Sequence, residues 1–339
     1  MTQFRKRTSV IGLGVILLLS ACSTEELPNE EGQATDPQLE ENAAPGEEAA
    51  YKISADAETP IEHVHGLGFD GDTGELLFAT HDGLRFFNDG AWYTTTSNRN
   101  DYMGFQATSE GFYASGHPGE GAQEGLVNPL GLVKSTDQGE TIEPLSLFGQ
   151  VDFHYMAASY EGKSVYGLIT AEVEDESGNV MTPGIYRTSD EGNTWNSLAL
   201  KGFSANSFGM MATHATDGEK LAIATQQGAY FSSDGGDTVS RITEDSEKIT
   251  AIAFKGEQII YAAVDGQDIV LRVINTDGSD VKELNNPYLD FENAITYITV
   301  NPENEEEIAF TTLDIDGYLS SDGGQSFQPI LDQGQMQGA

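Results

Sequence analysis

The sequence predicts an all-β fold, a six-bladed β-propeller, and three observations support this prediction. A short phrase of the form Ser/Thr-x-Asp-x-Gly-x-Ser/Thr recurs along the chain, with two degenerate copies. The aspartates of all copies fall 43 to 53 residues apart, at positions 89, 137, 190, 234, 277 and 322. The intervals between them hold short apolar runs that are typical of strands. A period of about 40–50 residues with several strands per unit is typical of propeller blades.

The N-terminal residues are expected to be an export signal. A charged stretch, Arg5 to Arg7, precedes the apolar run Val10–Leu19, which is too short to span a bilayer. The segment Leu19-Ser20-Ala21-Cys22 then resembles the lipobox of bacterial lipoproteins. This resemblance implies that residues 1–21 are removed and that Cys22 carries diacylglycerol and a further acyl chain such as palmitate, which together anchor firmly. The alternative is an ordinary secretory signal that happens to precede a cysteine.

Residues 22–58 are expected to form a disordered acidic tether between the lipidated cysteine and the folded part. They contain eleven acidic residues and one base, Lys52, and three prolines interrupt them. Such a composition cannot bury a core, and its charges repel one another. Tyr51-Lys52-Ile53 is the exception, because it could add an edge strand to a blade.

The charge of the chain limits its partners. The formal net charge is −39, and removal of the leader would leave 13 Lys and Arg residues against 55 Asp and Glu, or −42. This charge argues against nucleic acid and against an anionic membrane surface as partners. A cationic partner, a saline habitat or a merely solvated acidic surface all agree with it. Cys22 is the only cysteine, so no disulfide within the chain is expected.

Residues 59–333 are predicted to form the propeller, followed by a flexible tail at 334–339. The chain from Glu62 to Leu331 divides into six units of four strands each. Seven blades are the alternative if the Tyr51 region contributes more than an edge strand. The innermost strands of the six units are predicted at Val64–Phe69, Met103–Thr108, His154–Ala158, Phe208–Thr213, Thr250–Phe254 and Ala294–Val300.

The recurring phrase is expected to be a structural turn. Its aspartate can accept hydrogen bonds from backbone N–H groups two and three residues on, and its glycine supplies a positive φ. The phrase resembles the Asp-box, or BNR repeat, of sialidases, sortilin-type receptors and Ycf48-like assembly factors. That resemblance implies the propeller fold and says little about function. The structural aspartates are Asp137, Asp190, Asp234 and Asp322.

The strand order places most histidines on one face of the ring. In a propeller, the loops from second to third strand share a face with the loops that enter the next blade. The predicted ligand-binding residues on this face are His63, His65, His81, His117 and His154. Imidazole is a good ligand for copper and zinc, and we predict a metal at His63, His65 and His154. The alternative is that these are neutral histidines hydrogen-bonded to loop backbone.

The segment His63-Val64-His65-Gly66-Leu67 resembles the opening of a group of bacterial BNR-repeat lipoproteins. That group is commonly classed with glycosyl hydrolases because of its fold, which does not establish a reaction. Sialidase chemistry needs a cluster of arginines, and the mature chain has five scattered ones. Another glycosidase would need two carboxylates about 5–10 Å apart, and Asp101 and Asp152 are the candidates.

These observations favour a lipid-anchored, extracytoplasmic propeller. We expect it to bind a glycan, peptide or protein on its histidine-rich face, with copper or zinc as the candidate metals. A glycoside hydrolase other than a sialidase, acting on the same face, is the alternative.

Overall fold

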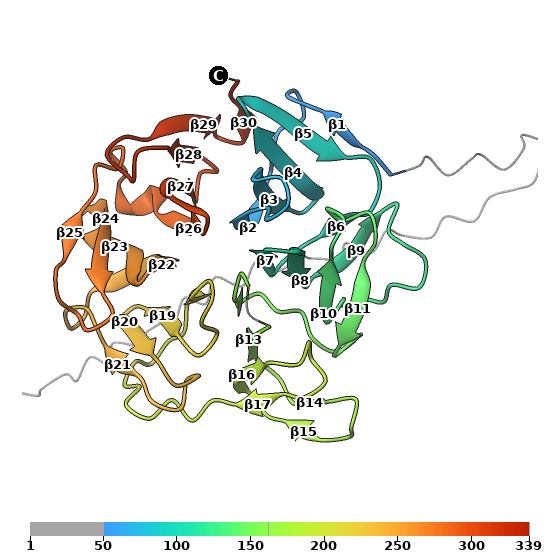
Figure 1. The fold of residues 1–339 in the computed structure, drawn as a ribbon, viewed down its shortest axis with the longest axis horizontal. Helices are drawn as coiled ribbons and strands as arrows, with labels where there is room; N and C mark the ends of the chain where they lie inside the picture. The colour runs from blue at the N-terminus through green and yellow to red at the C-terminus, as the bar shows by residue number, and fades with distance from the viewer. Residues whose placement is uncertain (1–50, 162, 339) are drawn as a thin grey trace, which may run out of the picture. The chain divides into compact units, whose positions relative to one another are not determined.

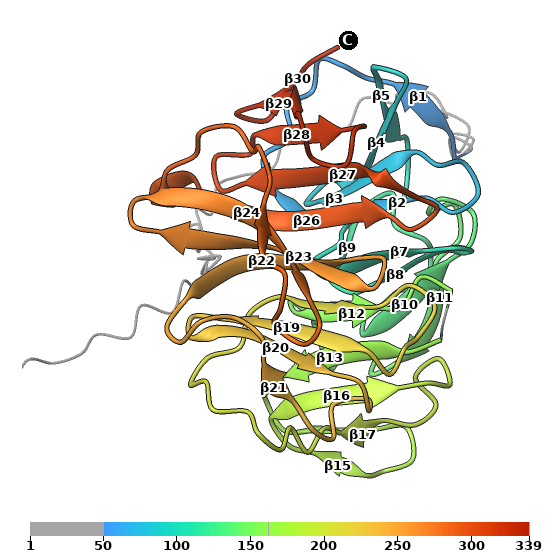
Figure 2. The same cartoon turned by 60° about the vertical axis from the view of Figure 1, so that its left-hand side comes forward.

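The computed structural model describes residues 51–161 and 163–338. Six antiparallel sheets are arranged around a central axis, each with its first strand innermost (Figure 1). Figure 2 shows successive blades packed against one another around the ring. The predicted six-bladed β-propeller is therefore confirmed, and the seven-bladed alternative is wrong.

Blades 1 to 3 occupy the N-terminal half of the described chain. The strands of blade 1 are β2 (Val64–Phe69), β3 (Leu76–Thr80), β4 (Gly83–Asn88), β5 (Ala91–Thr95) and, at its outer edge, β1 (Ile53–Ala55). Blade 2 consists of β7 (Phe105–Thr108), β8 (Gly111–Ala114), β10 (Leu132–Ser135) and β11 (Glu143–Ser146). Blade 3 consists of β12 (Met156–Ala158), β13 (Val165–Ile169), β16 (Gly184–Thr188) and β17 (Asn196–Ser197).

Blades 4 to 6 follow the same order. Blade 4 consists of β18 (Met211–Thr213), β19 (Leu221–Thr225), β20 (Gly228–Ser232) and β21 (Ser240–Arg241). Blade 5 consists of β22 (Lys248–Lys255), β23 (Gln258–Asp265), β24 (Asp268–Asn275) and β25 (Lys282–Glu283). Blade 6 consists of β26 (Ile295–Asn301), β27 (Asn304–Thr312), β28 (Gly317–Ser320), β29 (Gln328–Asp332) and β30 (Gln335–Met336).

Three short elements lie outside the blades. They are the pair β6 (Arg99–Asp101) with β9 (His117–Glu120), the hairpin of β14 (Val173–Glu174) with β15 (Val180–Met181), and the 3₁₀ turn η1 (Phe291–Asn293).

Buried apolar side chains fill the space between neighbouring blades. Six such clusters are found in the described residues, one at each of the six blade interfaces. The cluster that closes the ring joins Phe69 and Phe78 of blade 1 to Ile330 and Leu331 of blade 6. Because alternate side chains of a strand point to opposite faces, each blade contributes to two clusters.

The inner strands agree with the sequence prediction to different degrees. β2 has the predicted bounds, whereas β7 and β12 begin two residues later than expected. In blade 2, the chain first forms β6 and then reaches β7, and in blade 3 the His154 N–H donates to the Asp152 carbonyl. The segments that lead into the inner strands of blades 2 and 3 therefore do not pair within the blade sheets, and these segments carry Asp101 and Asp152.

The Asp turns, which we define by Asp137, Asp190, Asp234 and Asp322, join the third and fourth strands of their blades. Each aspartate accepts a hydrogen bond from the backbone N–H four residues on, whereas donors two and three residues on were expected; Asp322 also accepts from the N–H three residues on. The Ser or Thr two residues earlier donates to the same carboxylate. The glycine of each turn has φ between 87° and 93°, as predicted. The hydrogen bond reaches four residues along the chain because the aspartate side chain lies across the whole turn.

Both ends of the described chain are paired with the ring. β1 pairs with β5 and so extends blade 1 by residues that precede the expected boundary at residue 59. The tail was expected to be flexible from residue 334, but β30 pairs with β29. The indole of Trp92 also donates to the Gln337 carbonyl at 3.1 Å. The C-terminal segment therefore packs beside blade 1 (Figure 1).

Candidate functional site

Three histidines stack at the end of the ring opposite the Asp turns. His63 and His65 lie at the start of β2, and His81 follows β3 directly. The ring centroids of His65 and His81 are 4.5 Å apart, and those of His63 and His81 are 4.7 Å apart. We call this side of the molecule the histidine end; it comprises His63, His65, His81, His117 and His154.

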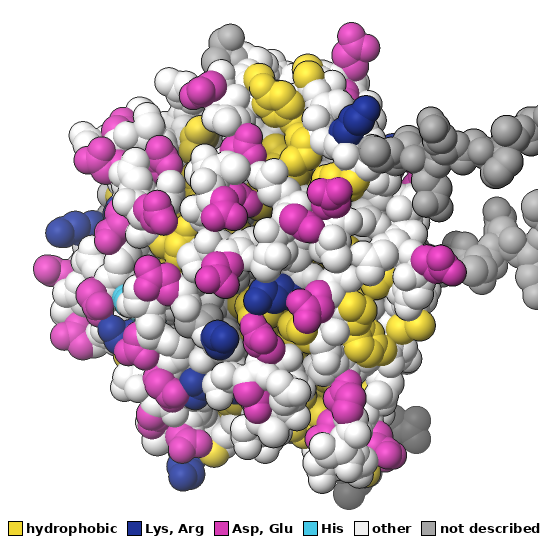
Figure 3. All heavy atoms as spheres, turned by 45° about the vertical axis from the view of Figure 1, so that its right-hand side comes forward, with side chains coloured by type: hydrophobic (Ala, Val, Ile, Leu, Met, Phe, Trp, Pro, Cys, Tyr) yellow, Lys and Arg dark blue, Asp and Glu magenta, His cyan; other side chains and the backbone are white. Residues whose placement is uncertain are grey.

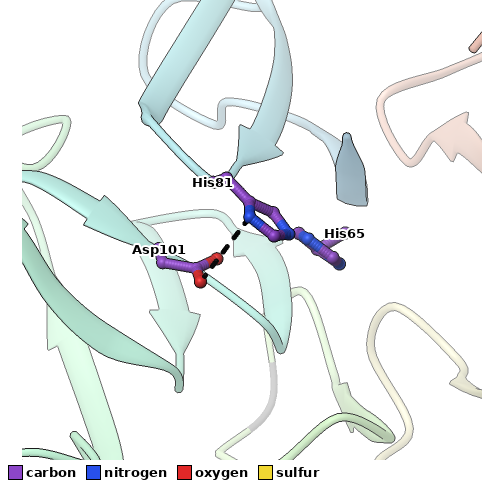
Figure 4. Close-up of side chains that lie close together, drawn as sticks. All are labelled: His65, His81 and Asp101. Atoms are coloured by element: carbon purple, nitrogen blue, oxygen red, sulfur yellow. Dashed lines mark ion pairs between the residues drawn. The ribbon is translucent and has the colours of Figure 1, made fainter. Parts of the chain in front are cut away.

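Asp101 lies beside this stack. It ends β6, and its Oδ2 is 3.9 Å from Nδ1 of His81 (Figure 4). His65, His81 and Asp101 each offer a ligand atom within 4.8 Å of the other two. Among the described residues, Nε2 of His65 and Oδ1 of Asp101 are buried and have no hydrogen-bond partner. Buried polar atoms without a partner are costly, so they need an explanation such as a bound ion.

A second group of side chains lies next to the first. Oδ2 of Asp152 is 3.3 Å from Nε2 of His117 and 3.2 Å from Nδ1 of His154. Nδ1 of His117 is 2.5 Å from Oδ1 of Asn128. β6 pairs with β9 so that Asp101 stands opposite His117, which brings the two groups together.

A glycine allows this close approach. Gly116 has φ of 123°, and a Cβ at this position would lie 1.9 Å from the Asp101 carbonyl oxygen. Only a residue without a side chain can therefore precede His117 here. The hydroxyl of Ser115 also accepts from the Phe153 N–H at 2.9 Å, which ties the Asp152 segment to the end of β8.

Burial shifts the pKa of three groups at the histidine end. Burial, followed by the positive charge of His81 and His63, lowers the pKa of His65 to about 3. Burial raises the pKa of Asp101, although His81 opposes the rise. Burial likewise raises the pKa of Asp152 against the effect of His154 and His117. At neutral pH, His65 is therefore a neutral imidazole with a free lone pair, which is the form that binds metals.

The predicted site residues are thus brought together, but in a different grouping. The metal set expected from sequence was His63, His65 and His154. In the structure, the compact set is His65 with His81 and Asp101, whereas His154 shares Asp152 with His117. The sequence analysis placed Asp101 and Asp152 as candidate catalytic acids, and the structure places both in the segments that lead into the inner strands of blades 2 and 3, beside the histidines.

A central cavity of about 380 Å³ runs between the inner strands. Its lining includes Gly66, the neighbour of His65, and extends to His214, which follows β18 near the Asp turns. Met211 lies on this lining but is buried in the core, as is Met156. These two methionines therefore fill core space.

Two further features concern the surface and the membrane. Acidic side chains are scattered over the face shown in Figure 3, with few Lys and Arg among them. In the part of the chain that the structure describes, no helix has the length and apolar character needed to cross a membrane. Cys22 and the predicted leader lie outside the described residues.

Comparison with known proteins shows likeness in fold. No family model and no curated protein matches the chain. A GH74 enzyme from Niastella koreensis has a TM-score of 0.52 and 15% identity, over 83% of this chain and 47% of that one. An ancestral GH74 enzyme has a TM-score of 0.52 and 12% identity, over 83% of this chain and 40% of that one.

The extracellular domain of a one-component system from B. thetaiotaomicron has a TM-score of 0.51 and 13% identity, over 86% of this chain and 36% of that one. This chain therefore spans less than half the length of each of these structures. At such identities the likeness carries the fold and nothing about activity. The chain is similar in fold to β-propellers of enzymes and of extracellular domains.

Proposed function

We propose that this protein is a lipid-anchored, extracytoplasmic propeller that binds its ligand at the histidine end through a transition-metal ion held by His65, His81 and Asp101. The observation that carries the proposal is the convergence of these three side chains, two of which present buried atoms that have no hydrogen-bond partner among the described residues. Two imidazoles and a carboxylate suit zinc, copper, iron and nickel. Ligand atoms around a tetrahedral zinc are about 3.4 Å apart, so binding needs movements of about 1 Å.

The charge of the protein supports this assignment. The chain carries 55 Asp and Glu residues against 16 Lys and Arg, and a field of this sign raises the local concentration of cations. Three protein ligands also leave coordination positions open. A glycan hydroxyl or a peptide carboxylate could occupy such a position, in keeping with the ligand classes expected from the sequence.

The metal is tested on the mature full chain, prepared without a His tag and loaded with Zn²⁺ or Cu²⁺. We expect elemental analysis after dialysis to show bound metal. In the His65→Ala/His81→Ala variant, we expect one equivalent fewer, with affinity at that site at least about 100-fold weaker. His214→Gln is the matched control, because His214 lies near the Asp turns. Equal metal content in the wild type and the double variant would exclude this site.

The location is tested separately. The lipobox-like segment that ends at Cys22 supports lipid anchoring, and the extracellular origin of one structural neighbour agrees with it. We expect wild-type protein in the membrane fraction to incorporate labelled palmitate. Cys22→Ser should release it from that fraction. Membrane retention of this variant would contradict the anchor.

A glycoside hydrolase is the second candidate, and one observation favours it. Burial raises the pKa of both Asp101 and Asp152, and a raised pKa is what a general acid needs. A panel of glycan substrates tests this reaction, with Asp101→Asn and Asp152→Asn as controls. Turnover by the wild type that both variants lose would establish the enzyme, and absence of turnover on every substrate would favour the binding protein.

A further inference from the structure

Exposed apolar side chains are concentrated at the histidine end. Eight large apolar side chains are exposed among the described residues, and seven of them lie in connections at this end. All four aromatic ones are among these seven: Tyr155, Phe208, Tyr288 and Phe291. The exception is Val281, which lies between β24 and β25. Single exposed apolar residues are ordinary on a protein surface, but a set gathered at one end marks a contact surface.

Three of these side chains come from two connections that lie side by side. Tyr288 (80% exposed) and Phe291 (49%) lie between β25 and β26, and Leu313 (54%) follows β27. The N–H of Leu313 donates to the carbonyl of Ala294 at 3.0 Å, which joins the two connections. We call Tyr288, Phe291 and Leu313 the apolar patch. The residues of the proposed metal site come from blade 1 and from the segment that leads into blade 2, so the patch is a separate surface over blades 5 and 6.

The backbone that carries Tyr288 is held in place. Two residues before it, the side-chain amide of Asn286 accepts from the Leu271 N–H and donates to the Ile269 carbonyl, both at 3.1 Å. Leu289, the residue after it, is buried in the core. Tyr288 therefore lies between two anchored residues, yet its own ring is left in solvent.

The other two side chains of the patch also lie on a tied backbone. The side chain of Asn293 accepts from the Asp314 N–H and donates to the Asp316 carboxylate, both at 2.9 Å. Asn293 ends the 3₁₀ turn that begins at Phe291, and Asp314 follows Leu313. An apolar surface that is already ordered loses little conformational entropy on binding, so it suits a partner.

The charge around the patch has one sign. Residues 284–294 and 313–316 contain four acids, Asp290, Glu292, Asp314 and Asp316, and no Lys or Arg. Glu292 and Asp314 are exposed. Arg272, on strand β24 of blade 5, is already paired with three acids. The patch therefore presents apolar groups and negative charge together.

This combination decides between the occupants that could cover the patch. The tether predicted at residues 22–58 has eleven acids against one base, and a second copy of the chain carries a net charge of −39. Both are repelled by the patch, as is an anionic membrane. A basic segment is attracted: the stems of its Lys and Arg side chains pack on apolar surface, and their charged ends reach ring faces and carboxylates.

We propose that the apolar patch docks a basic segment of a partner protein, in which Lys or Arg side chains accompany apolar ones. The apolar side chains of that segment cover Tyr288, Phe291 and Leu313, and its cations lie beside Glu292 and Asp314. Docking here goes beyond the proposed function, because it needs neither the metal ion nor the residues that hold it.

The test is the binding of a fluorescent synthetic peptide of alternating lysine and leucine to the mature full chain, measured by anisotropy at about 150 mM NaCl. A peptide of the same length and charge, with glycine in place of leucine, measures the attraction due to charge alone. We expect the lysine–leucine peptide to bind at least about tenfold more tightly, and Tyr288→Ser/Phe291→Ser to remove that difference. Val281→Ser, which removes an exposed apolar side chain at the other end of the ring, is the matched control and should bind as wild type does.

The acids of the patch are tested with the same peptide. Glu292→Gln/Asp314→Asn should weaken its binding about threefold more than Glu161→Gln/Glu303→Gln does. The second variant removes the same charge from exposed positions between first and second strands, at the end of the Asp turns. Equal losses in the two variants would reduce the attraction to net charge and overturn the proposal.

The remaining outcomes also decide. Equal affinity for the two peptides, no binding of either, or a preference that survives in Tyr288→Ser/Phe291→Ser would overturn docking at the patch. A neutral glucose oligosaccharide is tested in parallel. If it binds and that variant loses it, without selective binding of the peptide, the patch is a glycan surface and the basic partner is wrong. Zn²⁺ content should be unchanged in Tyr288→Ser/Phe291→Ser, and peptide binding unchanged in His65→Ala/His81→Ala, so failure of either proposal leaves the other standing.

Discussion

The two ends of the ring use the same residue types in opposite ways. In the Asp turns, hydroxyl and backbone donors surround the aspartates, and those from Thr238 and Ser326 lower the pKa of Asp234 and Asp322 to about 2. At the histidine end, Asp101 and Asp152 each keep a buried oxygen without a partner among the described residues, and burial raises their pKa. The first arrangement stabilises the charged carboxylate, and the second does not.

The histidines show the same difference. His214 follows β18 near the Asp turns and has partners on both nitrogens: Nδ1 accepts from the N–H of Thr216 and Asp217, and Nε2 is 3.3 Å from Glu257. His65 is partly buried, and its buried Nε2 has no partner within the part of the chain that the structure describes. The fold provides partners for both nitrogens of His214 but leaves Nε2 of His65 without one among the described residues. It therefore gives up stability at His65, which is expected of a binding site.

The largest expected effect on stability is that of His214→Ala. The variant loses the hydrogen bonds of the imidazole and its edge-to-face contact with Phe254, whose centroid is 5.5 Å away. We expect a loss of about 2–3 kcal/mol in the free energy of unfolding, measured with urea, and no change in metal content. A larger loss for His65→Ala than for His214→Ala would break the comparison between the two ends.

A smaller loss is expected for Asp137→Ala. This change removes the acceptor of the Thr141 N–H at 2.8 Å and of the Ser135 hydroxyl at 2.9 Å. We expect unfolding to become easier by about 1–2 kcal/mol, with metal binding intact. Urea titration of the variant beside wild type measures the difference. An unchanged midpoint would show that the turn keeps its shape without the carboxylate.

The contribution of the Asp turns to the free energy of unfolding should also change as the pH falls. The folded-state pKa of Asp234 and Asp322 is about 2, below the ordinary value, so the unfolded chain binds protons first as the pH falls. Their contribution to stability is therefore present above about pH 4 and is lost toward pH 2. It is modest, because both side chains are exposed to solvent. In Asp234→Asn/Asp322→Asn, we expect the loss of stability between pH 4 and pH 2 to be shallower than in wild type; parallel curves would contradict this.

The smallest expected change is that of Asp152→Asn in metal-free protein. Its raised pKa means that the folded state favours the neutral carboxyl, so stability falls as the pH rises through that pKa. Neutralising the group removes this cost but also weakens the contacts with His117 and His154. We expect a net change within about 1 kcal/mol at pH 7, on the stabilising side. A loss above about 2 kcal/mol would make Asp152 a structural residue like Asp137.

Much of the fold could be predicted from the sequence, because the period of the Asp turns sets the blade count and the apolar runs set the strands. β2 lies where it was expected, and the histidines of the first three blades gather on one side as the strand order implies. Strand order is a local property of each blade, so a single sequence is enough to infer it.

The grouping within the site could not be predicted. Contact between His81 and Asp101 depends on how two neighbouring blades meet, and no local pattern encodes that. The pair β6 and β9 is a short ladder with an irregular register, which forms between an entry segment and a loop. The positions of the inner strands alone grouped His63 and His154 with His65, whereas the structure brings the ligand atoms of His81 and Asp101 together with that of His65.

The closure of the ring has a consequence for chain topology. Each of the six described sheets is built from one contiguous stretch of sequence, and blades 1 and 6 meet only through packing and the contacts of Trp92 and Ile61 with residues 334–337. The ring thus has no blade that both ends must complete together. A circular permutant that joins the two ends and opens the loop between β21 and β22 would keep all six sheets whole. Such a permutant would present the same histidine end from a chain that begins in blade 5.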